Sequence, residues 1–70
     1  MAYRRVETRA QFHTRIIKRC VSLADKYERR AAAAETEKPR QTWLSKAEAE
    51  RRNAELHRRL LASLQNELIE

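Results

Sequence analysis

Glycine is absent from the 70-residue sequence, and proline and cysteine occur once each, as Pro39 and Cys20. Without glycine, the chain lacks the glycine-rich loops that cradle phosphates in nucleotide-binding enzymes. With so few turn residues, it is also unsuited to a β-sheet protein, whose strands are joined by tight turns. Ala, Leu, Arg, Glu, Lys and Gln dominate instead, and these are strong helix formers. The composition therefore predicts an all-α protein.

Long apolar runs are also missing, because Arg, Lys or Glu interrupts each apolar cluster well before the ~20 residues needed to cross a bilayer. The Arg-rich N-terminal segment has the charge of an organellar targeting peptide, but it is poor in Ser and its apolar pattern continues past Tyr27. The single thiol and the lack of a cleavable signal pattern indicate a reducing compartment. We therefore expect a cytoplasmic protein with no membrane span.

The chain is short enough to form one domain at most, over residues 1–70. A domain of this size buries only about 60% of its unfolded surface when it folds alone. A lone cysteine cannot supply a disulfide framework, so association with another chain is the expected source of extra stability.

Two amphipathic patterns follow one another along the chain. At 100° per residue, the first places an apolar arc opposite a basic one, and Thr8 and Gln11 before it have the spacing of a capping box. The arc comprises Phe12, Ile16, Ile17, Cys20, Val21, Leu23, Ala24, Tyr27 and Ala31. We predict a first helix over about 8–36.

The second pattern is an apolar stripe that includes His57. Its other members are Trp43, Ala47, Ala54, Leu56, Leu60, Leu61, Leu64 and Leu68. Ser45 and Glu48 form a second possible capping box, which predicts a helix over about 42–68.

Pro39 separates the two patterns, and because it lacks an amide hydrogen and disfavours a helical Lys38, we predict a turn at about 37–41. The fold expected is a two-helix antiparallel hairpin, with Cys20 roughly level with His57. The apolar arc of the first helix is broader than one partner helix covers. We therefore expect a homodimer that closes as a four-helix bundle.

The net positive charge of the chain lies in its first half. Residues 1–34 carry nine Lys or Arg and three acids, whereas residues 35–70 carry seven of each. In the second helix, Glu48 with Arg52, Arg51 with Glu55 and Glu55 with Arg59 have the i,i+4 spacing of ion pairs. The polar arc of the first helix carries six cations instead, namely Arg15, Lys18, Arg19, Lys26, Arg29 and Arg30.

A row of cations along a helix is suited to the phosphate backbone of DNA or RNA. We predict a nucleic-acid-binding regulatory or accessory factor that uses these six residues. The alternative is a protein-protein adaptor or inhibitor that docks on an acidic protein, and a solvated face without a partner or an anionic membrane surface are further alternatives. The sequence shows no helix-turn-helix turn, zinc finger or RNA-binding aromatic motif that would indicate base-specific readout.

Few residues have the character of a reactive or metal-binding site. Cys20, His57 and His13 are the only set with metal-ligand chemistry, but they lack the spacing of a zinc motif, so we predict no metal and no cofactor. A two-helix hairpin offers little concave volume for a catalytic pocket, and we predict that the protein is not an enzyme. Trp43, the only tryptophan, is interpreted as closing the core near the turn, or as an apolar anchor for a partner.

Overall fold

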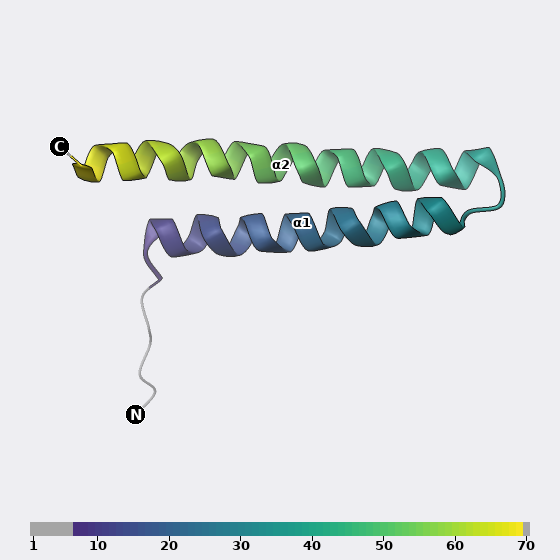
Figure 1. Cartoon of the computed structure of the whole chain (residues 1–70), viewed down its shortest axis with the longest axis horizontal. Coiled ribbons are helices and arrows are strands. Elements are labelled where there is room, and N and C mark those ends of the chain that lie inside the picture. Colours follow the sequence, from purple (N-terminus) through teal and green to yellow (C-terminus); the bar gives the residue numbers. More distant parts are fainter. Residues whose placement is uncertain (1–6, 70) are drawn as a thin grey trace, which may run out of the picture.

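The structure is a computed structural model, which describes the backbone of residues 7–69 and the side chains of residues 7–66. It contains two helices, α1 over Arg9–Ala33 and α2 over Glu37–Ile69. The helices run antiparallel and side by side, and α2 extends past the start of α1 (Figure 1). The predicted all-α hairpin is confirmed. Within the described part of the chain, neither helix has an apolar stretch that could cross a membrane.

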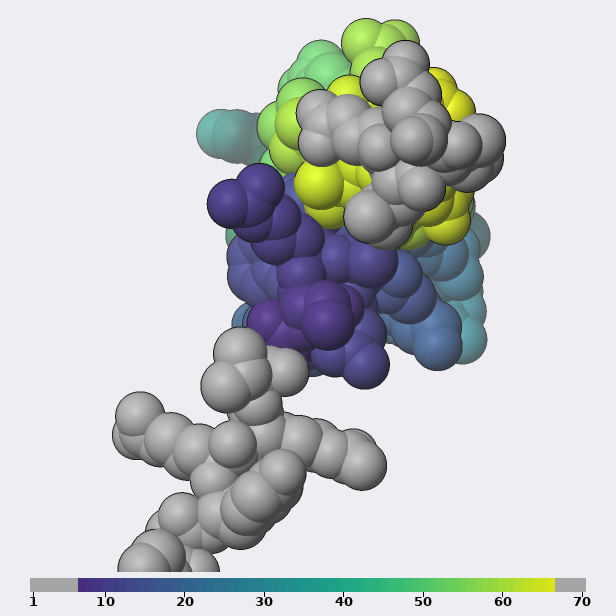
Figure 2. All heavy atoms as spheres, turned by 90° about the vertical axis from the view of Figure 1, so that its left-hand side faces the viewer, coloured from purple at the N-terminus to yellow at the C-terminus, as the bar shows by residue number. Residues whose placement is uncertain are grey.

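The contact between the helices is made by small side chains. The buried apolar residues are Cys20, Ala24, Ala31, Ala47 and Ala54. Figure 2 looks along the hairpin from the end where α1 begins, and the start of α1 lies directly against the end of α2. Because the alanine side chain is small, the two helix backbones approach closely. Among the described residues, no large side chain is fully buried.

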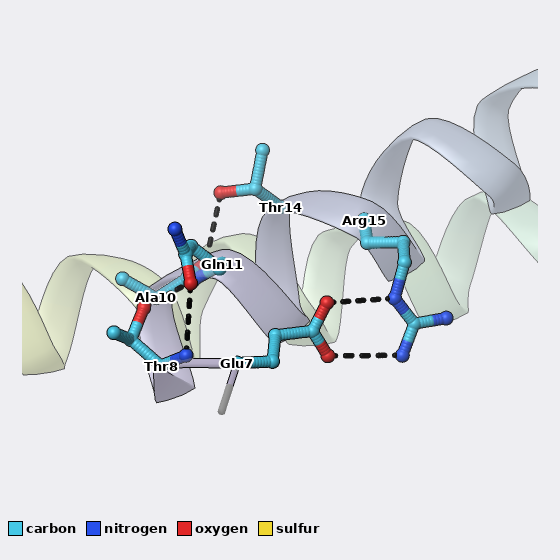
Figure 3. A network of polar contacts seen from close by, with 6 residues as sticks. All are labelled: Glu7, Thr8, Ala10, Gln11, Thr14 and Arg15. Atoms are coloured by element: carbon cyan, nitrogen blue, oxygen red, sulfur yellow. Dashed lines mark hydrogen bonds and ion pairs between the residues drawn. The ribbon is translucent and has the colours of Figure 1, made fainter. Parts of the chain in front are cut away.

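The start of α1 confirms the first predicted capping box. The Thr8 hydroxyl accepts a hydrogen bond from the Gln11 amide at 3.0 Å, and the Gln11 side-chain oxygen accepts one from the Thr8 amide at 2.9 Å (Figure 3). These two bonds satisfy amides that have no partner within the helix, and they fix the first residue of α1 at Arg9.

The turn lies earlier than predicted. Residues 34–36 connect the helices, so the turn predicted at about 37–41 is wrong. Of the helices predicted over about 8–36 and 42–68, the first ends three residues early and the second begins five residues early, whereas their outer ends agree to one residue. Pro39 is the third residue of α2, where the missing amide hydrogen costs nothing because the first-turn amides have no intrahelical acceptor. The first bond of the new helix runs from the Arg40 amide to the Thr36 carbonyl, at 3.4 Å.

Ser45 and Glu48 consequently lie inside α2, and the second predicted capping box is wrong. The turn needs no glycine, because Ala34 leaves α1 with extended backbone and no described residue has a positive φ. The Arg40 guanidinium donates to the Ala34 carbonyl at 3.2 Å and pairs with Glu37 at 3.3 Å, which ties the end of α1 to the start of α2.

The earlier turn also changes which residues face each other. His57 lies against His13, with 2.8 Å between their Nδ1 atoms, and Cys20 lies against Asn53, with 3.8 Å from its sulfur to the amide nitrogen. The predicted pairing of Cys20 with His57 is therefore wrong. Moving the centre of the turn from about residue 39 to residue 35 shifts the facing residue by about two helical turns.

Candidate functional site

The six predicted cations all lie on the outward side of α1. Arg15, Lys18, Arg19, Lys26, Arg29 and Arg30 are each exposed to solvent. At 100° per residue they spread over roughly a third of the helix circumference, opposite the buried Ala24. We call these six residues the basic face.

Arg15 and Arg30 have partners on their own chain. The Arg15 guanidinium forms a two-point ion pair with Glu7, at 3.0 and 3.2 Å, and its hydrogen bond to Glu7 lowers the pKa of that carboxyl (Figure 3). Arg30 lies over the Trp43 ring, 5.0 Å from its centroid. Among the described residues, the remaining four cations form no ion pair. Most of the basic face is thus available to an external anion.

The acids of α1 are held away from the basic face by a residue of α2. Arg51 donates to Glu28 and to Asp25, each at 3.0 Å, so it connects the two helices along one side of their contact. Its hydrogen bond lowers the pKa of Glu28, and Glu28 in turn raises the pKa of Arg51. The sequence predicted Arg51 to pair with Glu55 along its own helix, and this prediction is wrong.

The outward side of α2 neutralises itself. Arg52 pairs with Glu48 at 3.3 Å, and Arg59 pairs with Glu55 at 3.5 Å, as the i,i+4 spacing predicted. Arg58 also reaches Glu55, at 3.8 Å. The two helices therefore present different surfaces to solvent, one with unpaired cations and the other with alternating charges.

The basic face is slightly hollowed at its N-terminal end. A shallow depression of about 420 Å³ is lined by Ala10, Gln11, Thr14, Arg15 and Lys18. Arg15 and Lys18 of the basic face thus lie at this depression, together with the polar side chains of Gln11 and Thr14.

The predicted set of metal-ligand residues is divided by the structure. His13 and His57 come together, but Cys20 lies elsewhere along the hairpin, near Asn53. Burial raises the pKa of the Cys20 thiol, and a hydrogen bond with Glu50 raises it further. The thiol is therefore protonated at neutral pH and poorly suited to nucleophilic attack. In the described part of the chain, no group of three or more His, Cys, Asp or Glu residues is placed to hold a metal ion.

Trp43 is half-buried near the turn. It stacks on Tyr27 with 5.7 Å between ring centroids, and Lys46 lies 4.9 Å from the Trp43 ring centroid. These contacts, with that of Arg30, close this end of the core, as the structural interpretation predicted. The role of Trp43 as an anchor for a partner stays a prediction.

A groove that was not predicted from the sequence runs between the helices on the side opposite Arg51. It has a volume of about 260 Å³ and is lined by Ile16, Arg19, Cys20, Leu23, Glu50 and Asn53. Helical spacing places Phe12 and Leu60 on the same side, with 40% and 42% of their surface exposed. In the sequence, the breadth of the apolar arc of the first helix indicated that apolar surface would stay uncovered. The arrangement of the helices shows that this surface lies beside the groove.

Comparison of the chain with protein families, with characterised proteins and with solved structures finds no match.

Proposed function

We propose that this protein is a nucleic-acid-binding regulatory or accessory factor whose basic face docks on the phosphate backbone of DNA or RNA. The observation that carries the proposal is the division of charge between the helices. Five of the six cations of the basic face have no ion-pair partner among the described residues, while Arg51 holds Asp25 and Glu28 at the contact between the helices. Neighbouring cations repel each other, and binding of a polyanion offsets this repulsion.

The dimensions of the basic face support a phosphate backbone as the ligand. Arg15 and Arg30 are fifteen residues apart, which is about 22 Å at the rise of an α-helix. Contacts to four to six phosphates release condensed counterions, so affinity should fall about 100- to 1,000-fold between 50 and 200 mM salt. The proposed role is binding without catalysis, in the cytoplasm, where the Cys20 thiol stays reduced.

The test is a titration of the protein with labelled duplex DNA and with structured RNA at these two salt concentrations. Replacing Lys18, Lys26 and Arg29 by Gln should reduce the salt slope by about three, because each lost phosphate contact removes about one. The matched control replaces Arg52, Arg58 and Arg59 by Gln, which removes the same charge from the self-paired side of α2. Equal losses in the two variants, or no binding at low salt, would contradict the proposal.

A homodimeric four-helix bundle is part of the same proposal. Among the described residues, the buried core of one hairpin contains only small side chains, and the groove with Phe12 and Leu60 beside it is uncovered in a single chain. A second copy seated on this side would bury these residues, would bring Arg19 to the edge of the interface, and would leave most of each basic face exposed. Sedimentation equilibrium should give the mass of a dimer, and Leu60→Lys should give that of a monomer.

An adaptor or inhibitor that docks on an acidic protein is the rival function. The observation that favours it is the position of Arg19, which lines the groove and also belongs to the basic face. Such a complex would depend on Phe12 and Leu60 as much as on the cations. If nucleic-acid binding is lost when the cations are replaced but is retained in Phe12→Ala, the result favours the nucleic-acid-binding function over the adaptor function.

A further inference from the structure

The two histidines of the chain meet between the helices near the start of α1. His13 comes from α1 and His57 from α2, and their Nδ1 atoms are 2.8 Å apart. Both rings are half-buried, with centroids 5.0 Å apart and planes inclined at 44°. The rings are therefore held by packing, with their Nδ1 atoms at hydrogen-bond distance from each other.

Phe12 packs against both rings and restricts their orientation. Its ring lies edge-on to His13 at 5.4 Å and to His57 at 6.1 Å between centroids. A pair of ligands that is already oriented loses little conformational freedom when it binds an ion. Phe12 thus has the position of a residue that supports a ligand pair.

We propose that His13 and His57 form a two-nitrogen binding site for a divalent transition-metal ion that prefers tetragonal coordination, such as Ni²⁺ or Cu²⁺. Two metal-nitrogen bonds of about 2.0 Å that meet at a right angle place their nitrogens about 2.8 Å apart. The tetrahedral angle preferred by Zn²⁺ requires about 3.3 Å. The separation of the Nδ1 atoms matches the right-angled geometry. Water fills the other positions of the ion.

The proton balance of this step is simple. In the present contact one Nδ1 carries a proton and donates it to the lone pair of the other Nδ1. Binding a metal through both Nδ1 atoms requires that this proton moves to Nε2 of the same ring. When both rings start neutral, no net proton is released. The ion then replaces the hydrogen bond as the link between α1 and α2.

The experiment uses the full chain without a histidine affinity tag, and Ni²⁺ as the probe. Calorimetry should show saturable binding of one Ni²⁺ per chain, and the melting temperature should rise with Ni²⁺ concentration but not with Mg²⁺. His13→Gln and His57→Gln should each weaken binding by about tenfold or more, because each removes one of two ligands. Circular dichroism without metal establishes that both variants remain helical.

Cys20→Ser is the matched control, because Cys20 lies against Asn53 rather than against the histidine pair. This variant should bind Ni²⁺ as the parent does. Cu²⁺ bound to the parent should give an electron paramagnetic resonance spectrum with coupling to two nitrogens. The proposal is overturned if either histidine variant binds Ni²⁺ as tightly as the parent, if one ion binds per two chains, or if Zn²⁺ binds more tightly than Ni²⁺.

Discussion

The two ends of the hairpin differ in how completely they are closed. At the turn end, Trp43 stacks on Tyr27, and Arg40 ties the last residues of α1 to the start of α2. At the open end, where α1 begins, Phe12 is 40% exposed and Leu60 is 42% exposed. At the turn end an aromatic stack and an arginine thus join the helices, although Leu44 beside them is 46% exposed. At the open end the two histidines join them instead.

The largest effect is expected at the turn end, for Trp43→Ala. This change removes the stack on Tyr27 and the ring beneath Arg30. We expect the free energy of unfolding to fall by about 2–4 kcal/mol, which corresponds to roughly 10–20 °C in melting temperature for a domain of this size. Thermal denaturation followed by circular dichroism measures it.

The control is Leu44→Ala, which removes a neighbouring apolar side chain that is 46% exposed. It should change the free energy of unfolding by no more than about 0.5 kcal/mol. If the two substitutions cost the same, the turn end does not depend on the aromatic stack, and the contrast between the ends fails.

A smaller effect is expected at the open end, for Phe12→Ala. Phe12 contacts the His13 and His57 rings, but much of its surface is already in water. In dilute protein we expect a loss of about 1 kcal/mol, or roughly 4–8 °C. At high concentration the loss should be larger, because the proposed dimer also buries this side chain. Thermal denaturation over a range of protein concentrations makes the comparison, and a loss as large as that of Trp43→Ala would reverse the order of the two ends.

The sequence predicted the helices well because their signal is local. A helical period needs only the spacing of apolar residues, and the Thr8 and Gln11 capping box needs only three residues between its partners. The turn depended on Pro39, and proline suits both a turn and the first turn of a helix. Its place in α2 is decided by how the helices pack, which the local pattern does not contain.

The features of the candidate sites that were missed all follow from the register of the two helices. His13 faces His57 only because the turn is centred on residue 35. Arg51 had an acid at i+4 on its own helix and two acids across the contact, and sequence spacing shows only the first. The exposed position of the six cations, in contrast, could be predicted for each residue, because it depends on the period of one helix alone.

The smallest effect is expected for two carboxylates in ion pairs, Glu28 at the contact between the helices and Glu7 at the open end. Arg51 lowers the pKa of Glu28 at the contact between the helices, and Arg15 lowers the pKa of Glu7 at the open end. A lowered pKa in the folded state means that the ion pair stabilises the protein above the ordinary value of 4.5 and stops doing so as the pH falls through the folded value. The melting temperature should therefore decrease from about pH 5 downward.

Glu28→Gln and Glu7→Gln separate the two contributions to this acid sensitivity. Both pairs are exposed, so each substitution should lower the melting temperature at pH 7 by a few degrees at most, on the order of 1–5 °C. Glu28→Gln should remove more of the decrease below pH 5, because its pair joins α1 to α2, whereas the Glu7 pair joins only the start of α1 to its second turn. Melting curves between pH 3 and pH 7 give the comparison. A larger effect of Glu7→Gln would mean that the open end is fastened by Arg15, and the difference between the two ends would then lie in their apolar contacts alone.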